Sequence, residues 1–166
     1  ARPFNICYQQ SKLDENAAAQ DFIKFIESVE GQKIIADNGY ISIDVTDNYT
    51  ASGVSGGISL NGSTSVGPIM EKLAESYKGM NPDVTIDIQQ TGSGAGITSA
   101  TEGTCDIGMS SRELKQEELD AGLTEMKIAD DGIAVIVNLE NPIENITSDE
   151  IMKIYTGEIN NWSELA

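Results

Sequence analysis

The sequence predicts an α/β fold: a single lobe with a flavodoxin-like, mainly parallel sheet and helices on both of its faces. Two observations lead to this prediction. Short apolar segments alternate with segments of helical periodicity along the 166 residues, an order typical of parallel strands joined by helices. In addition, two apolar segments, 58–60 and 84–88, each end in a loop of small residues that leads directly into a helical segment.

Composition restricts the partners and the chemistry. Ten basic residues against 27 acidic residues give a formal net charge of −17, which argues against nucleic acid and anionic membrane surfaces as partners, because both require clustered Lys and Arg. The sequence has no His, the usual general base and the commonest metal ligand. No nucleophile is paired with a base either. We therefore expect a protein that is not an enzyme, with no catalytic residue, no metal site and no cofactor.

Two cysteines, Cys7 and Cys105, lie in apolar, strand-like segments without the spacing of a metal site. Buried free thiols are predicted, in preference to a disulfide or a nucleophile. No run approaches the roughly 18 apolar residues of a membrane-spanning helix, and no signal peptide opens this chain.

The amino-terminal third begins with residues 2–8, which alternate apolar and polar and predict a strand that starts at a sheet edge, at Pro3. Residues 17–29 predict a helix, and a second short helix should end at Asn38 and Gly39. Residues 40–43 suit a short strand, and the polar segment 44–57 suits a linker. The first helix should bury one stripe made of Phe22, Phe25, Ile26 and Val29.

The rest of the chain continues the alternation. Residues 105–109 predict a third strand, and Ser110 with Glu113 forms a capping-box pattern that predicts a helix directly after it. The uninterrupted apolar run 133–137 is typical of a strand buried on both faces. A second capping box, Thr147 with Glu150, predicts a final helix that closes at Gly157.

Three of the predicted strands end in loops rich in Ser, Thr and Gly, around residues 63–65, 92–96 and 110–112. Ligands of parallel α/β sheets bind at the carboxyl ends of the strands, and the unpaired N–H groups of a helix start favour an anion. Glycine in any one loop is also explained by a tight turn. Neither Gly-rich loop carries the lysine of a mononucleotide P-loop, and residues 92–96 only approximate the dinucleotide pattern. Arg112 is the one basic side chain at this rim. It is either an exposed side chain in solvent or a ligand whose guanidinium donates two hydrogen bonds to an oxyanion.

Four segments in order, 61–68 (NGSTSVGP), 90–96 (QTGSGAG), 106–112 (DIGMSSR) and 154–162 (IYTGEINNW), closely resemble the phosphate-binding protein of bacterial phosphate ABC transporters, a type II periplasmic binding protein. Residues 1–43 resemble the carboxyl end of that family, although here they come first. The resemblance therefore implies a circularly permuted first lobe, in which 44–57 joins the two segments and the second lobe is missing. Surface termini that lie close together make such rejoining physically reasonable.

The resemblance also implies a function, a place and a partner. The family binds inorganic phosphate outside the cytoplasm, extracellular or periplasmic, often as a membrane-anchored lipoprotein, and delivers it to a membrane permease complex. Ser111 departs from the aspartate that some members have there. With the second lobe's loop absent we expect a weak half-site, and the exposed interlobe face would favour self-association. Carried over by position, Thr64, Ser65, Ser93 and Ser111 match residues that contact phosphate in the family. The loops themselves add Ser63, Gly94 and Arg112 to the predicted phosphate-binding residues.

Two alternatives have the same fold. One is a flavodoxin-like enzyme or cofactor domain that binds a phosphorylated ligand at the same strand ends, and the other is an inert, engineered scaffold. A bound flavin would give the purified protein a visible absorption band, whereas phosphate would not.

Overall fold

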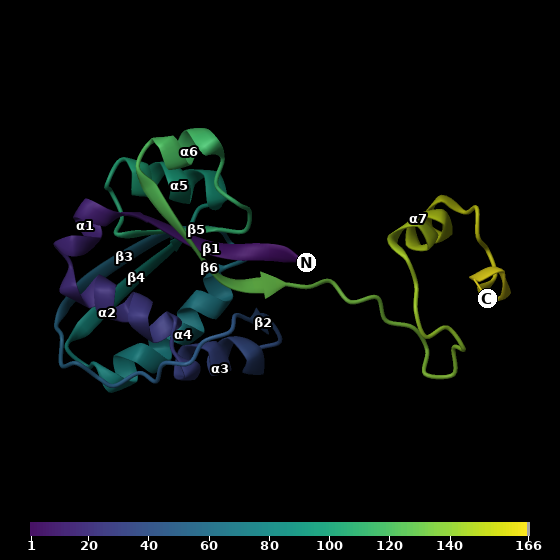
Figure 1. Ribbon diagram of the computed structural model, residues 1–166, viewed down its shortest axis with the longest axis horizontal. Helices are drawn as coiled ribbons and strands as arrows, with labels where there is room; N and C mark the ends of the chain where they lie inside the picture. The colour runs from purple at the N-terminus through teal and green to yellow at the C-terminus, as the bar shows by residue number, and fades with distance from the viewer. Residues whose placement is uncertain (166) are drawn as a thin grey trace. The chain divides into compact units, whose positions relative to one another are not determined.

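The computed structural model describes residues 1–165, which fall into two compact units, Ala1–Ile133 and the residues from Ala134 onward (Figure 1). The sheet and six of the helices lie in the first unit, and the second unit is described separately below. Within the described part of the chain, no helix is both long enough and apolar enough to cross a membrane.

The first unit is built on a six-stranded sheet of order β2-β6-β1-β5-β3-β4. β3 pairs in parallel with β4 and β5, whereas β1 is antiparallel to β5 and β6, and β2 is antiparallel to β6. Four of the six strands, β3 to β6, therefore point the same way, which confirms the α/β class; with two parallel and three antiparallel pairings, the sheet is mixed. The bounds are β1 Arg2–Gln9, β2 Ile41–Ser42, β3 Gly56–Gly62, β4 Val84–Gln90, β5 Ile107–Ser110 and β6 Leu123–Asp131.

Helices cover both faces of this sheet, as predicted (Figure 1). Successive residues of a strand point to opposite faces, and β1 shows this directly. Phe4 and Ile6 belong to the larger core, which holds the apolar side chains of α2, α3 and α4. Cys7 belongs to a smaller core with Ile97 of α5. The helices are α1 Gln10–Asp14, α2 Ala17–Ile26, α3 Val29–Asp37, α4 Gly67–Met80, α5 Ser93–Thr101 and α6 Gln116–Asp120.

The helix predicted over 17–29 is shorter in the structure. α2 ends at Ile26, and Ser28 begins α3 because its Oγ accepts the Gly31 N–H at 3.1 Å. Phe22, Phe25 and Ile26 are fully buried as predicted, whereas Val29 is 41% exposed. The new helix start turns Val29 away from the stripe, so including it was wrong.

Residues 44–57 have no regular structure before β3 begins at Gly56, as expected for a linker, but the segment is anchored. The ring of Tyr49 packs on Phe25 with 5.2 Å between centroids, and its hydroxyl donates to the Asp21 carboxylate at 2.5 Å. The amide of Val29 also donates to Asp47 O at 2.9 Å. The segment is therefore packed on the core, through Tyr49 and also through Val54.

Two local predictions are wrong. No helix follows β5 directly, because Ser110 Oγ accepts the Arg112 N–H at 3.2 Å and donates to Arg112 O at 2.7 Å, which makes a turn instead; α6 begins only at Gln116. The apolar run 133–137 is not a buried strand, since Ile133 is 93% and Ile136 is 90% exposed. The strand of this region is β6, which precedes the run.

The two cysteines are free and buried, as predicted. Burial is the largest cause that raises the pKa of Cys7 to about 12 and that of Cys105 to about 11. Both thiols therefore stay protonated near neutral pH, which makes them poor nucleophiles.

The second unit contains helix α7, Ser148–Thr156, and a short 3₁₀ helix, Trp162–Leu165. The predicted capping box is present: Thr147 Oγ1 accepts the Glu150 N–H at 3.2 Å, and the Glu150 carboxylate accepts the Thr147 N–H at 2.7 Å. Gly157 ends the helix with φ 79°, as predicted. This helix start thus follows from four local residues alone.

Candidate functional site

The three loops predicted to bind an anion meet at one edge of the sheet. The amide of Ser63, which follows β3, donates to Met109 O in β5 at 2.9 Å. The amide of Gly92, which follows β4, donates to Gly62 O at the end of β3 at 2.8 Å. Since β3, β4 and β5 run parallel, their carboxyl ends bring the loops side by side.

In the first loop, the Ser63 hydroxyl is buried and has a structural role, whereas Thr64 is exposed. Ser63 is 2% exposed, and its Oγ accepts the amides of Ser65 at 3.2 Å and Val66 at 3.4 Å. Thr64 is exposed, and its amide has no acceptor among residues 1–165. Ser63 therefore shapes the loop, while the Thr64 amide is available at the rim.

The second loop presents the open start of α5. Gly92, with φ 100°, leads into the helix, and the first helical bond runs from Gly96 N to Gly92 O at 3.0 Å. Over the described residues, the amides of Ser93, Gly94 and Ala95 have no protein acceptor, and no side chain caps the helix. Three consecutive N–H groups at a helix start carry a partial positive charge, which favours an anion.

The third loop touches the second through two serines. The Ser111 amide donates to Ser93 Oγ at 3.1 Å, and the two hydroxyl oxygens lie 3.3 Å apart. Both side chains are half-buried. Ser93 and Ser111, which lie 18 residues apart in the sequence, therefore form one hydroxyl pair at the start of α5.

Arg112 lies in the same loop, but its guanidinium holds a carboxylate of the protein. Nη1 and Nη2 donate to the two oxygens of Glu118 at 2.9 and 2.8 Å. Hydrogen bonding from Arg112 lowers the pKa of Glu118 to about 2, and the same bond raises the pKa of Arg112. The Arg112 guanidinium, which was predicted as a possible ligand of an oxyanion, is thus paired with Glu118 in this structure.

Sequence reasoning missed Glu118. Its spacing of six residues from Arg112 across a turn and a helix start gives no recognised signal, and only the fold shows that the Lys115 N–H also donates to it, at 2.8 Å. The site is therefore rich in neutral donors, with its one cation neutralised. Among the described residues, no group of three or more Cys, Asp or Glu side chains is arranged to hold a metal ion.

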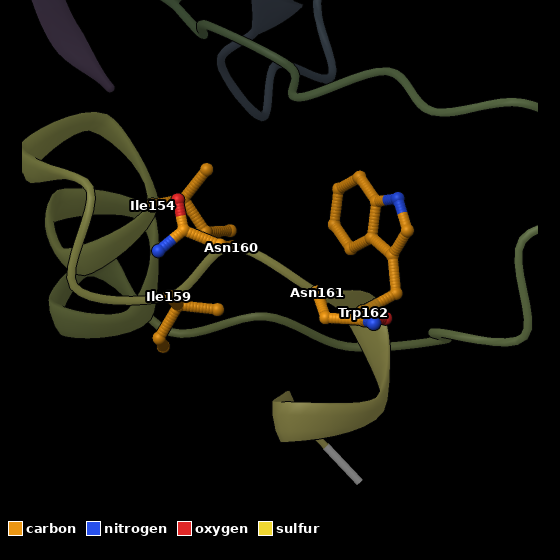
Figure 2. Close-up of a pocket in the computed structure, with 5 residues that line it drawn as sticks. All are labelled: Ile154, Ile159, Asn160, Asn161 and Trp162. Carbon is orange, nitrogen blue, oxygen red and sulfur yellow. The ribbon is translucent and has the colours of Figure 1, made fainter.

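A separate hollow of about 150 Å³ lies in the second unit (Figure 2). Figure 2 shows Ile154 of α7 and the indole of Trp162 on either side of it. Ile159, Asn160 and Asn161 complete the lining, so the hollow carries no charged side chain. It belongs to the second unit, whereas the strand-end loops belong to the first.

Comparison with known proteins gives consistent matches. A model of the PBP superfamily domain matches residues 47–166. The phosphate-binding protein PstS 2 of Streptococcus agalactiae serotype V is 43% identical over 166 residues, which cover 100% of this chain and 56% of that protein. The chain thus spans about half the length of this curated relative.

Two crystal structures are also similar. One is a phosphate-binding protein of a phosphate ABC transporter from Streptococcus pneumoniae TIGR4, with 46% identity and a TM-score of 0.87 over 99% of this chain and 63% of that chain. The other is a putative phosphate ABC transporter substrate-binding protein with bound phosphate from Clostridium perfringens, with 55% identity and a TM-score of 0.51 over 66% of this chain and 45% of that chain.

The matches differ in how much of this chain they include. Since the alignment with the S. agalactiae relative covers the whole chain, that protein carries the segments 1–43 and 58–166 in the order found here. The C. perfringens structure matches only 66% of the chain. The segment order predicted as a permutation is therefore shared with a streptococcal relative and is not peculiar to this chain.

Proposed function

The chain belongs to the PBP superfamily, and we propose that it forms one half of a binding site for inorganic phosphate in the solute-binding protein of an ABC transporter. The observation that carries this proposal is the meeting of three strand-end loops around the start of α5, where three amides lack an acceptor within residues 1–165. The similar proteins are named for phosphate binding, and one of the similar structures holds bound phosphate, which supports the same ligand.

The proposed roles follow from the contacts. Ser63 holds the first loop in shape through Oγ, and the exposed Thr64 and the neighbouring Ser65 face the ligand. The amides of Ser93 and Gly94 and the Ser93 hydroxyl donate from the start of α5. Ser111 donates through its hydroxyl. Arg112 supplies positive charge when its hydrogen bonds to Glu118 break.

The expected affinity is low. Hydrogen bonds to a charged group contribute roughly 1.5–3 kcal/mol each, so about five donors offer on the order of 10 kcal/mol. Association costs an estimated 4–15 kcal/mol, which leaves a small surplus when one side of the anion faces water. We expect a dissociation constant around millimolar, equivalent to roughly −4 kcal/mol. A chain of net charge −17 also requires that the anion be held by local donors.

A phosphate titration followed by amide chemical shifts tests the proposal. The amides of residues 63–65, 92–96 and 111 should shift together and saturate with one dissociation constant. The Ser76→Ala variant is the matched control, because Ser76 lies on α4 outside the three loops and should leave the constant unchanged. Small, unsaturated shifts spread over the surface would refute phosphate binding and leave an inert scaffold.

The role proposed for the whole protein is binding and delivery rather than catalysis. A solute-binding protein of this class works outside the cytoplasm, extracellular or periplasmic, and hands its ligand to a membrane permease. The two thiols, whose pKa values are raised by burial, and a sequence without His support a role without a nucleophile or base. Phosphate uptake by cells that carry or lack the corresponding gene would test the transport role.

A further inference from the structure

We propose that Asn5 and Glu125 are positioning residues that fix the third loop, residues 110–114, in the shape that phosphate binding requires. This inference rests on the proposed function and extends it to two side chains outside the three binding loops. Asn5 lies in β1 and Glu125 in β6, so both come from outside the strand–loop–helix units that carry the binding loops.

The contacts tie the two residues to the loop at two points. Asn5 is 2% exposed, and its Nδ2 donates to Glu125 Oε1 at 2.5 Å and to Arg112 O at 3.3 Å. Glu125 Oε1 also accepts the Leu114 N–H at 2.8 Å. One carbonyl and one amide of the loop are thus held by the same pair of side chains.

Strand register explains why these two side chains meet. Asn5 lies opposite Ser110 in β5 and opposite Lys127 in β6, while Glu125 lies opposite Cys7. Asn5 and Glu125 are therefore diagonal neighbours on one face of an antiparallel pair, a spacing that a long side chain can bridge. The register shifts by one residue between Phe4 and Asn5, and such bulges re-aim side chains next to binding sites.

The chemistry at position 5 also needs an explanation. Asn5 Oδ1 is buried and has no hydrogen-bond partner in the described part of the chain. A buried polar atom without a partner is unfavourable, and an apolar residue would avoid it. The hydrogen bonds that Nδ2 donates to Arg112 O and Glu125 account for an amide at this place.

The consequence concerns Ser111. Its neighbour Arg112 is held through the carbonyl by Asn5, and Ser110 closes the turn by donating to the same carbonyl at 2.7 Å. This turn directs the Ser111 amide at Ser93 Oγ. If Asn5 and Glu125 release the loop, Ser111 should leave Ser93 and the hydroxyl pair should open.

The Asn5→Asp variant tests this role, because it keeps the size of the side chain, removes both donors and places a carboxylate beside Glu125. Asn81→Asp is the matched control. Asn81 is 1% exposed and also has an Oδ1 without a partner in the described part of the chain, but its Nδ2 donates to the Tyr49 hydroxyl at 2.8 Å and to Tyr77 O at 3.3 Å rather than to the loop.

The first readout is amide hydrogen exchange without phosphate, normalised to the buried amides of β5. Asn5→Asp should speed exchange at Ser111 and Leu114 at least tenfold, and Asn81→Asp should not. The second is the phosphate titration, where only Asn5→Asp should raise the dissociation constant, at least fivefold. Unchanged local exchange in Asn5→Asp, or the same change in Asn81→Asp, would overturn the inference.

A second pair covers the case in which Asn5→Asp does not fold. Glu125→Gln keeps an acceptor oxygen and should behave like the parent chain, whereas Glu125→Ala should release Leu114 and speed its exchange at least tenfold. Equal exchange at Leu114 in both variants would contradict the role of Glu125. If the parent chain shows no saturable phosphate shift, the proposed function fails, and the exchange data still decide whether the pair fixes the loop.

Discussion

The amide of Ser111 donates a hydrogen bond to Ser93 Oγ at 3.1 Å, and this contact joins the loop after β5 to the first residue of α5. The two hydroxyls lie 3.3 Å apart, close enough for both to contact one oxyanion. This pair turns two loops into a single surface.

Ser93→Ala should weaken phosphate binding by about ten- to a hundredfold, because a hydrogen bond to a charged group is worth roughly 1.5–3 kcal/mol. It also removes the acceptor of the Ser111 amide. The measurement is the amide-shift titration, with Ser76→Ala as control. A dissociation constant within twofold of the parent would show that the Ser93 hydroxyl does not contact the anion.

Glu118 should make stability depend on acid pH. Its pKa is lowered from 4.5 to about 2 in the folded chain, so its ionised form contributes stability that is full above pH 4.5 and is lost as the pH falls toward 2. Urea unfolding of the parent and of Glu118→Gln should differ most near neutral pH. The difference should shrink between pH 4.5 and 2, and a constant difference across that range would contradict the pairing with Arg112.

Two glycines of α5 should respond in opposite ways to the same substitution. A Cβ at Gly96 would lie 2.5 Å from Asn61 O and from Gly62 Cα, so Gly96→Ala must push α5 off β3. We expect a loss of about 1–3 kcal/mol in the free energy of unfolding. Gly94→Ala meets no atom within 4 Å and should be neutral or gain up to about 1 kcal/mol. Equal effects in denaturant unfolding would show that the close approach of α5 is wrong.

The amino-terminal segment should be part of the core of the first unit. Phe25 is fully buried, and its ring lies edge-on to Tyr49 and tilted against Tyr77, so Phe25→Ala should cost about 3–5 kcal/mol. Val29 is 41% exposed, and Val29→Ala should cost less than about 0.5 kcal/mol. Calorimetric melting of the two variants gives the comparison, and similar melting temperatures would contradict the placement of α2 and α3.

The strand–loop–helix units were predictable because their signals are local. Ile58 and Leu60 are buried in β3, and the glycines and Pro68 mark the start of the next helix. β6 was not predicted, because Glu125 and Lys127 interrupt its apolar pattern; Glu125 is instead used to hold a loop. The run 133–137 has the composition of a buried strand, but the strand that pairs in the sheet is β6, which precedes it. Composition alone does not determine which segment pairs with a neighbouring strand.

The candidate site likewise has a part that the sequence predicts and a part that it does not. The three loops could be located from their residues, since Ser, Thr and Gly that follow three successive strands indicate a shared binding edge better than a turn in any one of them does. The residues that hold these loops in place could not be predicted from the sequence. Glu118 reaches Arg112 only because α6 starts at Gln116, and Asn5 reaches Glu125 only through the register of β1 on β6. Both relationships depend on tertiary structure, which no single-sequence pattern contains.

A crystal structure of this chain, at a phosphate concentration about tenfold above the measured dissociation constant, tests most directly whether three strand-end loops form one phosphate half-site. A phosphate should lie at the start of α5, with oxygens about 2.7–3.2 Å from the Gly94 amide, the Thr64 amide and the Ser111 hydroxyl. Phosphate bound elsewhere, or contacting only one of the three loops, would contradict it.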